Sequence, residues 1–122
     1  PLFDLDERVA LARAVCAQWE NVEVAGFSGL LVDHLRACGA QVLLRGVRSV
    51  SDFDYEQQLV GMYRRMLPAL EILYMPPAGD LAFISSTLVR EVALHGGEVD
   101  CFVPPLVAQR VRELLARGVT PA

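Results

Sequence analysis

The sequence has no excess of positive charge, no paired cysteines and no long apolar run, and each absence excludes a class of protein. Lys and Arg number 11 against 15 Asp and Glu, giving a net charge of −4, whereas general nucleic-acid binding requires a basic face. The cysteines Cys16, Cys38 and Cys101 are odd in number and lack CxxC spacing, which argues against a disulfide framework or zinc site and indicates reduced thiols in the cytoplasm. No uncharged run approaches the roughly 18 to 20 apolar residues that cross a bilayer. We therefore expect a soluble cytoplasmic protein that binds neither nucleic acid nor membrane.

The composition predicts a single domain over residues 1–122. Hydrophobic residues make up 53% of the chain and charged residues 21%, which excludes a disordered protein. A domain of this length buries roughly two-thirds of the surface that its unfolded chain exposes. A hydrophobic core is therefore expected without help from metals or disulfides.

Segments with helical and strand patterns alternate along the chain. Helices are predicted over 4–19, 30–38, 51–67, 85–97 and 106–118, and extended segments over 21–27, 41–46, 70–76 and 101–105. The apolar runs at 41–46 and 70–76 are typical of strands buried on both faces. This alternation predicts an α/β fold with a parallel sheet covered by helices on both faces, which binds its ligand beyond the carboxyl ends of the strands.

Two helices have particular sequence signals. Asp4 and Glu7 are spaced as a capping box at the start of the first helix. Ser51 and Asp54 are placed similarly in the helix over 51–67. The apolar stripe expected on that helix consists of Tyr55, Leu59, Met62 and Met66.

Three consecutive hydroxyl residues, Ser85, Ser86 and Thr87, stand at the start of the fourth predicted helix. The free N–H groups and the positive dipole end of a helix N-terminus attract anions. Added hydroxyls make a compact set of donors for phosphate oxygens. Ordinary N-capping explains one hydroxyl equally well, so a phosphate site and a simple cap both remain open.

The turn "RGVRS" places Arg45 and Arg48 three residues apart around a glycine, directly after an apolar run. Arginine offers a planar fork of donors to phosphate or carboxylate, and Gly46 lets the backbone bend or approach a ligand. The alternatives are solvated arginines or pairing with the acidic run Asp52, Asp54 and Glu56. A ligand role is favoured.

The sequence gives little support for a metal site or for catalysis by histidine. The acidic run is not expected to share one helical face, so it is interpreted as structural rather than as a metal site. His34 and His95 lie within predicted helices, and we expect neither to have a Ser or Cys partner. The sequence has no GxSxG, HExxH, Walker A or GxGxxG motif.

The segments "GFSGLL", "LLRGVRSVSDFDYEQQLVGMYR", "LYMPP" and "FISSTLVREVALHGGEV" resemble, in order and spacing, phosphopantetheine adenylyltransferases. The resemblance covers essentially the whole chain, and the pairing of RGxRxxxDFxYE with ISSTxxRE is specific. It implies a Rossmann-like nucleotidyltransferase fold, a cytoplasmic homohexamer and Mg²⁺ assistance. The implied reaction transfers the adenylyl group of ATP to 4′-phosphopantetheine, forming dephospho-coenzyme A, the precursor of coenzyme A, and pyrophosphate.

The resemblance also assigns residues. It implies that Leu31 and Arg45 bind the pantetheine substrate and that Glu56 contacts the nucleotide. It further implies an ATP site formed by Gly46, Val47, Arg48, Leu81, Ala82, Phe83, Ile84, Ser85, Ser86 and Thr87.

One family motif has no counterpart in the sequence. The family's TFDPxTxGH segment, which carries its catalytic His, and a later Lys match no position, so no catalytic residue is assigned and the metal ligands are unknown. We expect this segment and the first strand to lie upstream of Pro1. The alternatives are a non-catalytic module that binds ATP or coenzyme A, and a related nucleotidyltransferase with another acceptor.

Overall fold

The computed structural model describes residues 2–118 and divides into two compact units. The central unit comprises Phe27–Phe83, and the terminal unit comprises Pro1–Gly26 with Ile84–Ala122. Each unit is described below by itself. The single domain expected over 1–122 stays a prediction.

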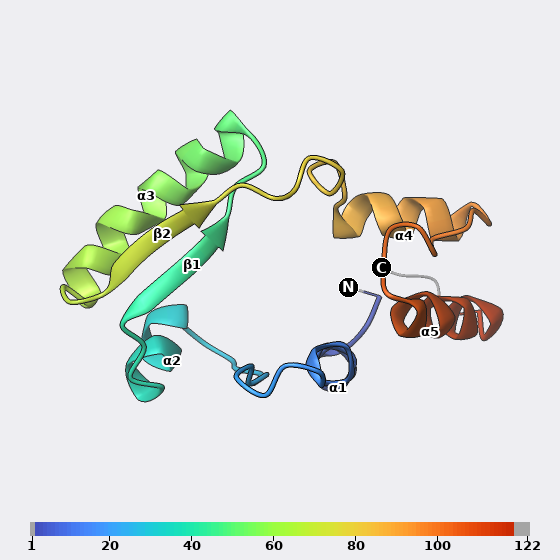
Figure 1. The fold of residues 1–122 in the computed structure, drawn as a ribbon, viewed down its shortest axis with the longest axis horizontal. Coiled ribbons are helices and arrows are strands. Elements are labelled where there is room, and N and C mark those ends of the chain that lie inside the picture. Colours follow the sequence, from blue (N-terminus) through green and yellow to red (C-terminus); the bar gives the residue numbers. More distant parts are fainter. Residues whose placement is uncertain (1, 119–122) are drawn as a thin grey trace. The chain divides into compact units, whose positions relative to one another are not determined.

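The central unit is built on a strand–helix–strand motif (Figure 1). Strands β1 (Val42–Gly46) and β2 (Glu71–Met75) pair in parallel, with Val42 opposite Glu71 and Gly46 opposite Met75. Helix α3 (Val50–Met66) connects them. The predicted parallel pairing is confirmed, since two parallel strands need such a crossover between them.

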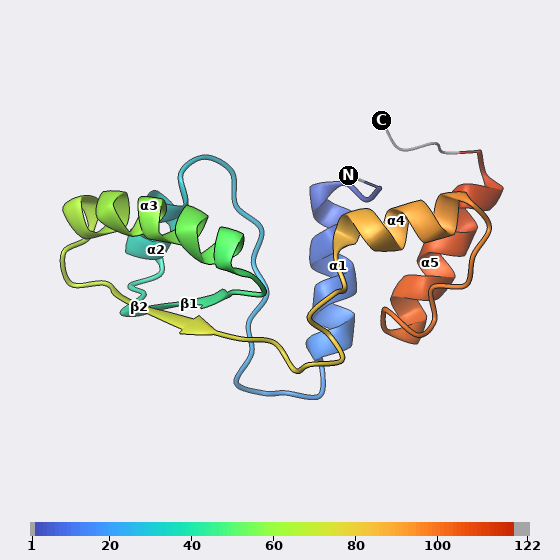
Figure 2. The ribbon, with the colours of Figure 1, turned by 90° about the horizontal axis from the view of Figure 1, so that it is seen from above.

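Helices α2 (Leu31–Ala37) and α3 pack against one face of this sheet (Figure 2). Their core contains Val32, Leu35, Tyr63 and Leu70, and Leu43 and Ile72 of the strands pack against it. The alternate strand residues are exposed, Leu44 at 54% and Leu73 at 55%. The prediction of strands buried on both faces is therefore wrong, because α2 and α3 cover only the face that carries Leu43 and Ile72.

Helix α3 differs from its prediction in both its start and its buried face. Ser49 is the N-cap, and its hydroxyl accepts the Asp52 N–H at 3.1 Å, so the predicted caps at Ser51 and Asp54 are wrong. The buried residues are Glu56, Val60 and Tyr63. The predicted stripe is largely on the outside, with Tyr55 61% and Met62 41% exposed. Two adjacent stripes of α3 have helical spacing, and packing selected the one that meets the sheet and α2.

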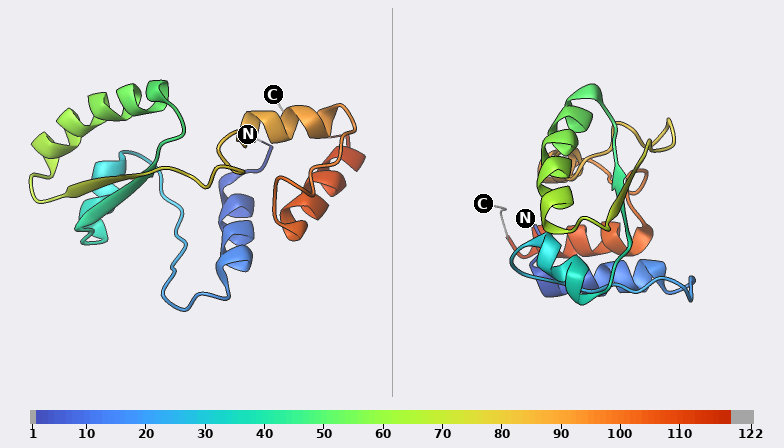
Figure 3. Two further views of the ribbon diagram at one scale, coloured as in Figure 1. Left: turned by 45° about the horizontal axis from the view of Figure 1, so that its top comes forward. Right: turned by 90° about the vertical axis from the view of Figure 1, so that its left-hand side faces the viewer.

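The described part of the terminal unit, residues 2–26 and 84–118, is helical (Figure 3). Its helices are α1 (Leu5–Cys16), α4 (Ser86–Leu94) and α5 (Pro105–Ala116). The predicted capping box of α1 is confirmed, with the Glu7 N–H donating to Asp4 Oδ1 at 2.8 Å. The unit's core, which α4 and α5 share, contains Ala93, Val99, Ala108 and Val111.

Two predicted extended segments are not strands. Residues 21–27 pair with no strand, and the stretch over 101–105 begins with a turn closed by the Phe102 N–H on Val99 O at 2.9 Å. A strand needs a hydrogen-bonding neighbour, and β1 and β2 pair only with each other in the described residues. Within residues 2–118, no helix is long and apolar enough to span a membrane.

Candidate functional site

Arg45 and Glu56 form a two-pronged ion pair at the carboxyl end of β1. Arg45 Nε donates to Glu56 Oε2 at 2.9 Å, and Nη2 donates to Oε1 at 2.5 Å. The Glu56 side chain is 9% exposed and that of Arg45 33%. The hydrogen bond from Arg45 to Glu56 raises the pKa of the guanidinium, against a smaller opposing effect of desolvation. The pairing that the sequence left as an alternative is therefore present, while the ligand roles of both residues stay predictions.

The second arginine of the turn is also held by helix α3. The Arg48 backbone N–H lies 3.2 Å from Asp52 Oδ2, and Arg48 Nε lies 3.4 Å from the same oxygen. Asp52 and Glu56 are four residues apart on α3, and each pairs with one of the two arginines. A Cβ added at Gly46 would meet nothing within 4 Å, so local packing does not require glycine there.

The hydroxyls at the start of α4 have different environments. Ser85 is the N-cap, and its Oγ accepts the Leu88 N–H at 3.1 Å. Within residues 2–118, the exposed hydroxyls of Ser86 and Thr87 have no hydrogen-bond partner. The capping interpretation therefore applies to Ser85, and two donors remain for a ligand.

A cavity of about 340 Å³ adjoins this helix start within the terminal unit. Its polar groups come from Arg8, Ser85, Ser86 and Arg90. Arg90 makes no ion pair with the described residues, so its charge is available to an anion. The sequence interpretation missed Arg90, although it follows Ser86 by one helical turn and so shares a face of α4 with it. The apolar lining of the cavity consists of Leu2, Phe3, Ile84, Val89, Val103, Val107 and Val111.

The remaining predicted residues lie in the central unit. Leu31 begins α2 and packs partly against the core. Leu81, Ala82 and Phe83 end the unit in a turn, in which the Leu81 N–H donates to Ala78 O at 2.9 Å. Leu81 is 51% and Phe83 60% exposed, so the side chains have accessible apolar surface. The predicted residues thus fall into two groups, of which Ile84, Ser85, Ser86 and Thr87 belong to the terminal unit.

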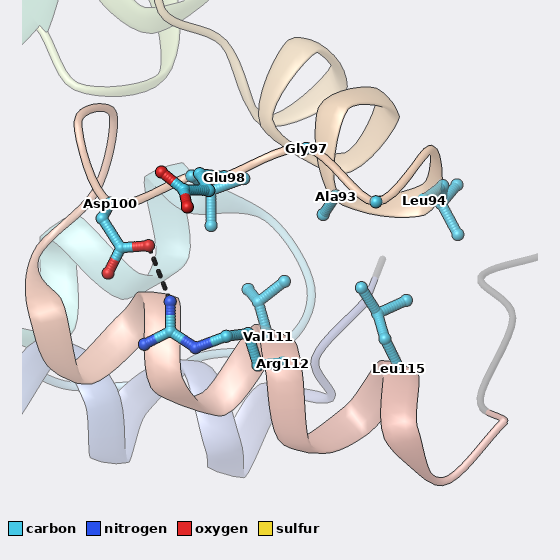
Figure 4. Close-up of a pocket in the computed structure, with 10 residues that line it drawn as sticks. Ala93, Leu94, Gly97, Glu98, Asp100, Val111, Arg112 and Leu115 are labelled. Carbon is cyan, nitrogen blue, oxygen red and sulfur yellow. Dashed lines mark hydrogen bonds and ion pairs between the residues drawn. The ribbon is translucent and has the colours of Figure 1, made fainter.

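A second cavity, of about 530 Å³, lies between the end of α4 and helix α5 (Figure 4). Arg112 is paired with Asp100 at 2.6 Å, and Glu98 also lines the space. None of the predicted site residues lines this cavity, and its carboxylates repel phosphate. We therefore place the candidate anion site at the start of α4 and not here.

The prediction that His34 has no Cys partner is wrong. His34 Nε2 lies 3.5 Å from Cys38 Sγ. The two residues are four apart on the sequence, the spacing that places side chains together on a helix.

The described residues contain no group of three or more His, Cys, Asp or Glu side chains placed to hold a metal ion. Mg²⁺ in nucleotide sites is bound mainly by substrate phosphates, water and one or two carboxylates. Such an ion would arrive with its nucleotide, and the magnesium prediction stays a prediction.

Comparison with known proteins places the sequence among nucleotidyltransferases. A family described as cytidylyltransferase-like matches residues 1–92. The phosphopantetheine adenylyltransferase of Tolumonas auensis is 55% identical over 112 residues, which are 92% of this chain and 68% of the relative. That of Sodalis glossinidius is 55% identical over 115 residues, covering 94% of this chain and 72% of the relative.

Proposed function

Since the chain belongs to the phosphopantetheine adenylyltransferase family, we propose that it transfers the adenylyl group of ATP to the phosphate of 4′-phosphopantetheine. The products are dephospho-coenzyme A and pyrophosphate. The observation that carries this proposal is the 55% identity to enzymes of that name over more than nine-tenths of the chain.

The donors at the start of α4 support a role in holding the ATP phosphates. Ser86 and Thr87 present hydroxyls beside backbone N–H groups at a helix N-terminus, and Arg90 adds a charge to the adjoining cavity. Backbone donors, hydroxyls and a cation within one helical turn suit the charge and size of a phosphate chain. Ser85 holds the end of the helix in place by capping it.

The ion pair at Arg45 is compatible with substrate binding. A guanidinium has five N–H donors, and Glu56 accepts two hydrogen bonds from it, so roughly three donors remain for the pantetheine phosphate. The carboxylate fixes the plane of the guanidinium before the substrate arrives. Glu56 thereby acts as a positioning residue for Arg45, in addition to the nucleotide contact predicted for it.

Adenylyl transfer depends mainly on alignment and charge. An oxygen of the substrate phosphate attacks the α-phosphorus of ATP, and the bond to the departing pyrophosphate breaks. The protein accelerates this step by holding the two phosphates in line and surrounding them with positive charge. In the central unit, the family resemblance gives Arg45 to the substrate phosphate and Arg48 to ATP. In the terminal unit, Ser86, Thr87 and Arg90 offer donors to phosphate.

The family resemblance supports three further parts of the proposal. Mg²⁺ enters with ATP and neutralises part of the phosphate charge. The enzyme works in the cytoplasm, and its subunits assemble as a hexamer. Size-exclusion chromatography with light scattering tests the assembly.

The reverse reaction tests the activity directly. The purified protein is given dephospho-coenzyme A, pyrophosphate and Mg²⁺, and ATP is followed by luciferase luminescence. The proposal expects ATP to form with dephospho-coenzyme A but not with nicotinamide adenine dinucleotide, the product of an adenylyltransferase with another acceptor. Binding of ATP or coenzyme A without turnover would instead support the non-catalytic module, and turnover of another dinucleotide would support a different acceptor.

Arg48→Ala tests the role in nucleotide binding, and urea unfolding of the same variant measures any loss of stability separately. The Arg48 contact to Asp52 joins side chains 42% and 36% exposed, and exposed pairs contribute less than about 1 kcal/mol. We expect the KM for ATP to rise about tenfold or more, since a charged hydrogen bond contributes ~1.5–3 kcal/mol. Unchanged ATP kinetics would exclude the proposed role, and a matched Arg64→Ala variant controls for loss of charge.

A further inference from the structure

The cavity of about 340 Å³ at the start of α4 brings together side chains from three helices of the terminal unit. Helix α1 contributes Arg8, α4 contributes Ser86 and Arg90, and α5 contributes apolar residues such as Val107. Among the described residues, no Asp or Glu lines this cavity. Its charged groups are therefore both guanidinium groups, although the chain as a whole has a net charge of −4. The family resemblance assigns no role to Arg8.

The guanidinium of Arg8 is fixed on one side and keeps donors on the other. Its Nε donates to the backbone oxygen of Asp4 at 3.2 Å, which leaves both terminal NH₂ groups for a ligand. Arg8 makes no ion pair with the described residues. The two carboxylates of the α1 capping box are engaged elsewhere, since Asp4 Oδ1 accepts the Glu7 N–H at 2.8 Å and Glu7 pairs with Arg110. The charge of Arg8 is therefore available to an anion.

The position of Arg8 at the cavity is set before a ligand arrives. Its neighbour Glu7 joins α1 to α5 through the ion pair with Arg110, in which both side chains are only 28% exposed. Arg110 is held in turn by Glu113 at 3.0 Å. On α4, Arg90 follows the helix start by one turn and lines the same cavity. Two guanidinium groups from different helices are thus presented to one space.

We propose that Arg8 is a further phosphate-binding residue, and that Arg8 and Arg90 together hold the triphosphate of ATP and, in the reverse reaction, pyrophosphate. This inference rests on the proposed function for the identity of the ligand. Guanidinium groups bind phosphate oxygens through paired N–H donors. The apolar walls of the cavity exclude water, which strengthens the attraction between these charges. Arg8 binds the leaving group and transfers no proton.

The charge of the cavity favours a phosphate chain over a carboxylate. A carboxylate carries one negative charge and would leave one guanidinium uncompensated beside walls that are mostly apolar, which is unfavourable. A pyrophosphate or triphosphate carries enough negative charge for both arginines. The hydroxyl of Ser86 adds a donor at the same place.

The kinetic experiment measures the reverse reaction of Arg8→Gln and of the wild type at one ionic strength. We expect the KM for pyrophosphate to rise about tenfold, because a charged hydrogen bond is lost, while the KM for dephospho-coenzyme A stays nearly the same. A purely structural role of Arg8 would move both KM values together. An unchanged KM for pyrophosphate would overturn the proposal.

Arg13→Gln is the matched control. Arg13 also lies on α1, is exposed and donates its Nε to a backbone oxygen, that of Val24, at 3.1 Å, but it does not line this cavity. We expect its KM for pyrophosphate to remain that of the wild type. A rise equal to that in Arg8→Gln would mean that loss of positive charge on α1, and not the cavity, causes the effect, and would overturn the proposal.

Arginine modification of the wild-type protein tests the contact without a substitution and without turnover. Phenylglyoxal modifies accessible guanidinium groups, and peptide mass spectrometry follows Arg8 and Arg13 with and without inorganic tripolyphosphate. We expect tripolyphosphate to slow modification of Arg8 but not of Arg13, and equal protection or none would overturn the proposal. If the protein forms no ATP in the reverse reaction while Arg8 is still protected, the proposed function fails and the phosphate site stands. If ATP forms and Arg8 is not protected, only the role of Arg8 fails.

Discussion

The ion pair between Arg45 and Glu56 provides the sharpest test of how charge pairing stabilises the central unit. The two partners differ in exposure, since the Glu56 side chain is 9% and that of Arg45 33% exposed. Removing one partner of a buried pair leaves the other charge without compensation, and the loss is larger for the more deeply buried partner. We therefore expect an asymmetry in which Arg45→Ala destabilises the protein more than Glu56→Ala.

The expected magnitudes follow from that difference. Arg45→Ala leaves the Glu56 carboxylate buried and unpaired, which costs about 3 kcal/mol, near the lower end of values for fully buried pairs. Glu56→Ala leaves a guanidinium that can reach water, and the loss of charged hydrogen bonds costs about 1.5 kcal/mol. The double variant should lose less than the sum, by about 1.5 kcal/mol, because its second substitution removes an already broken pair.

Urea unfolding followed by circular dichroism measures all three variants against the wild type. Two results would refute the reasoning. One is additivity of the two single changes within about 0.5 kcal/mol, which is the behaviour of independent sites. The other is a larger loss for Glu56→Ala, which would mean that the carboxylate does more for the core than accept hydrogen bonds from Arg45.

Three further changes test the terminal unit. Ser85→Ala removes the cap of α4 and should cost about 1 kcal/mol in urea unfolding. Gly97→Ala would place a Cβ 2.7 Å from Val92 Cγ1 and 3.0 Å from Val92 O, and such overpacking should lower stability by about 1–3 kcal/mol. The hydrogen bond from Gln109 is the main cause that lowers the pKa of Glu113. Its ionised form therefore adds stability above the unfolded pKa, and the advantage over Glu113→Gln should vanish as the pH falls through the folded pKa.

Each of these has a matched comparison. Ser86→Ala should leave stability nearly unchanged while raising the KM for ATP, and equal destabilisation by both serine variants would contradict the assignment of the cap. Gly79→Ala, where a Cβ meets nothing within 4 Å, should be tolerated. A stability difference between Glu113→Gln and wild type that persists unchanged at pH 3 would contradict the direction given for the Glu113 pKa.

Local features of the fold were predictable from the sequence because short-range interactions fix them. The Asp4 capping box and the N-terminus of α4 depend on residues within one helical turn. The parallel pairing of β1 and β2 was predictable from the helix between them. The contact between His34 and Cys38 was also visible in the sequence as a four-residue spacing, and was missed.

Tertiary structure alone decided which of several locally acceptable choices was realised. Helix α3 has two apolar stripes of equal period, and only packing against β1 and α2 determined that Val60 and Tyr63 face the core. The sequence contains three possible acidic partners for Arg45. Helix α3 begins at Val50, and this start determined that Glu56 forms the ion pair with Arg45. Residues 21–27 have strand composition but, within the described residues, no neighbouring strand. The sequence of a segment determines the interactions among its own neighbouring residues, such as helix caps. Burial, charge pairing and strand pairing depend on which other segments the folded chain places next to it.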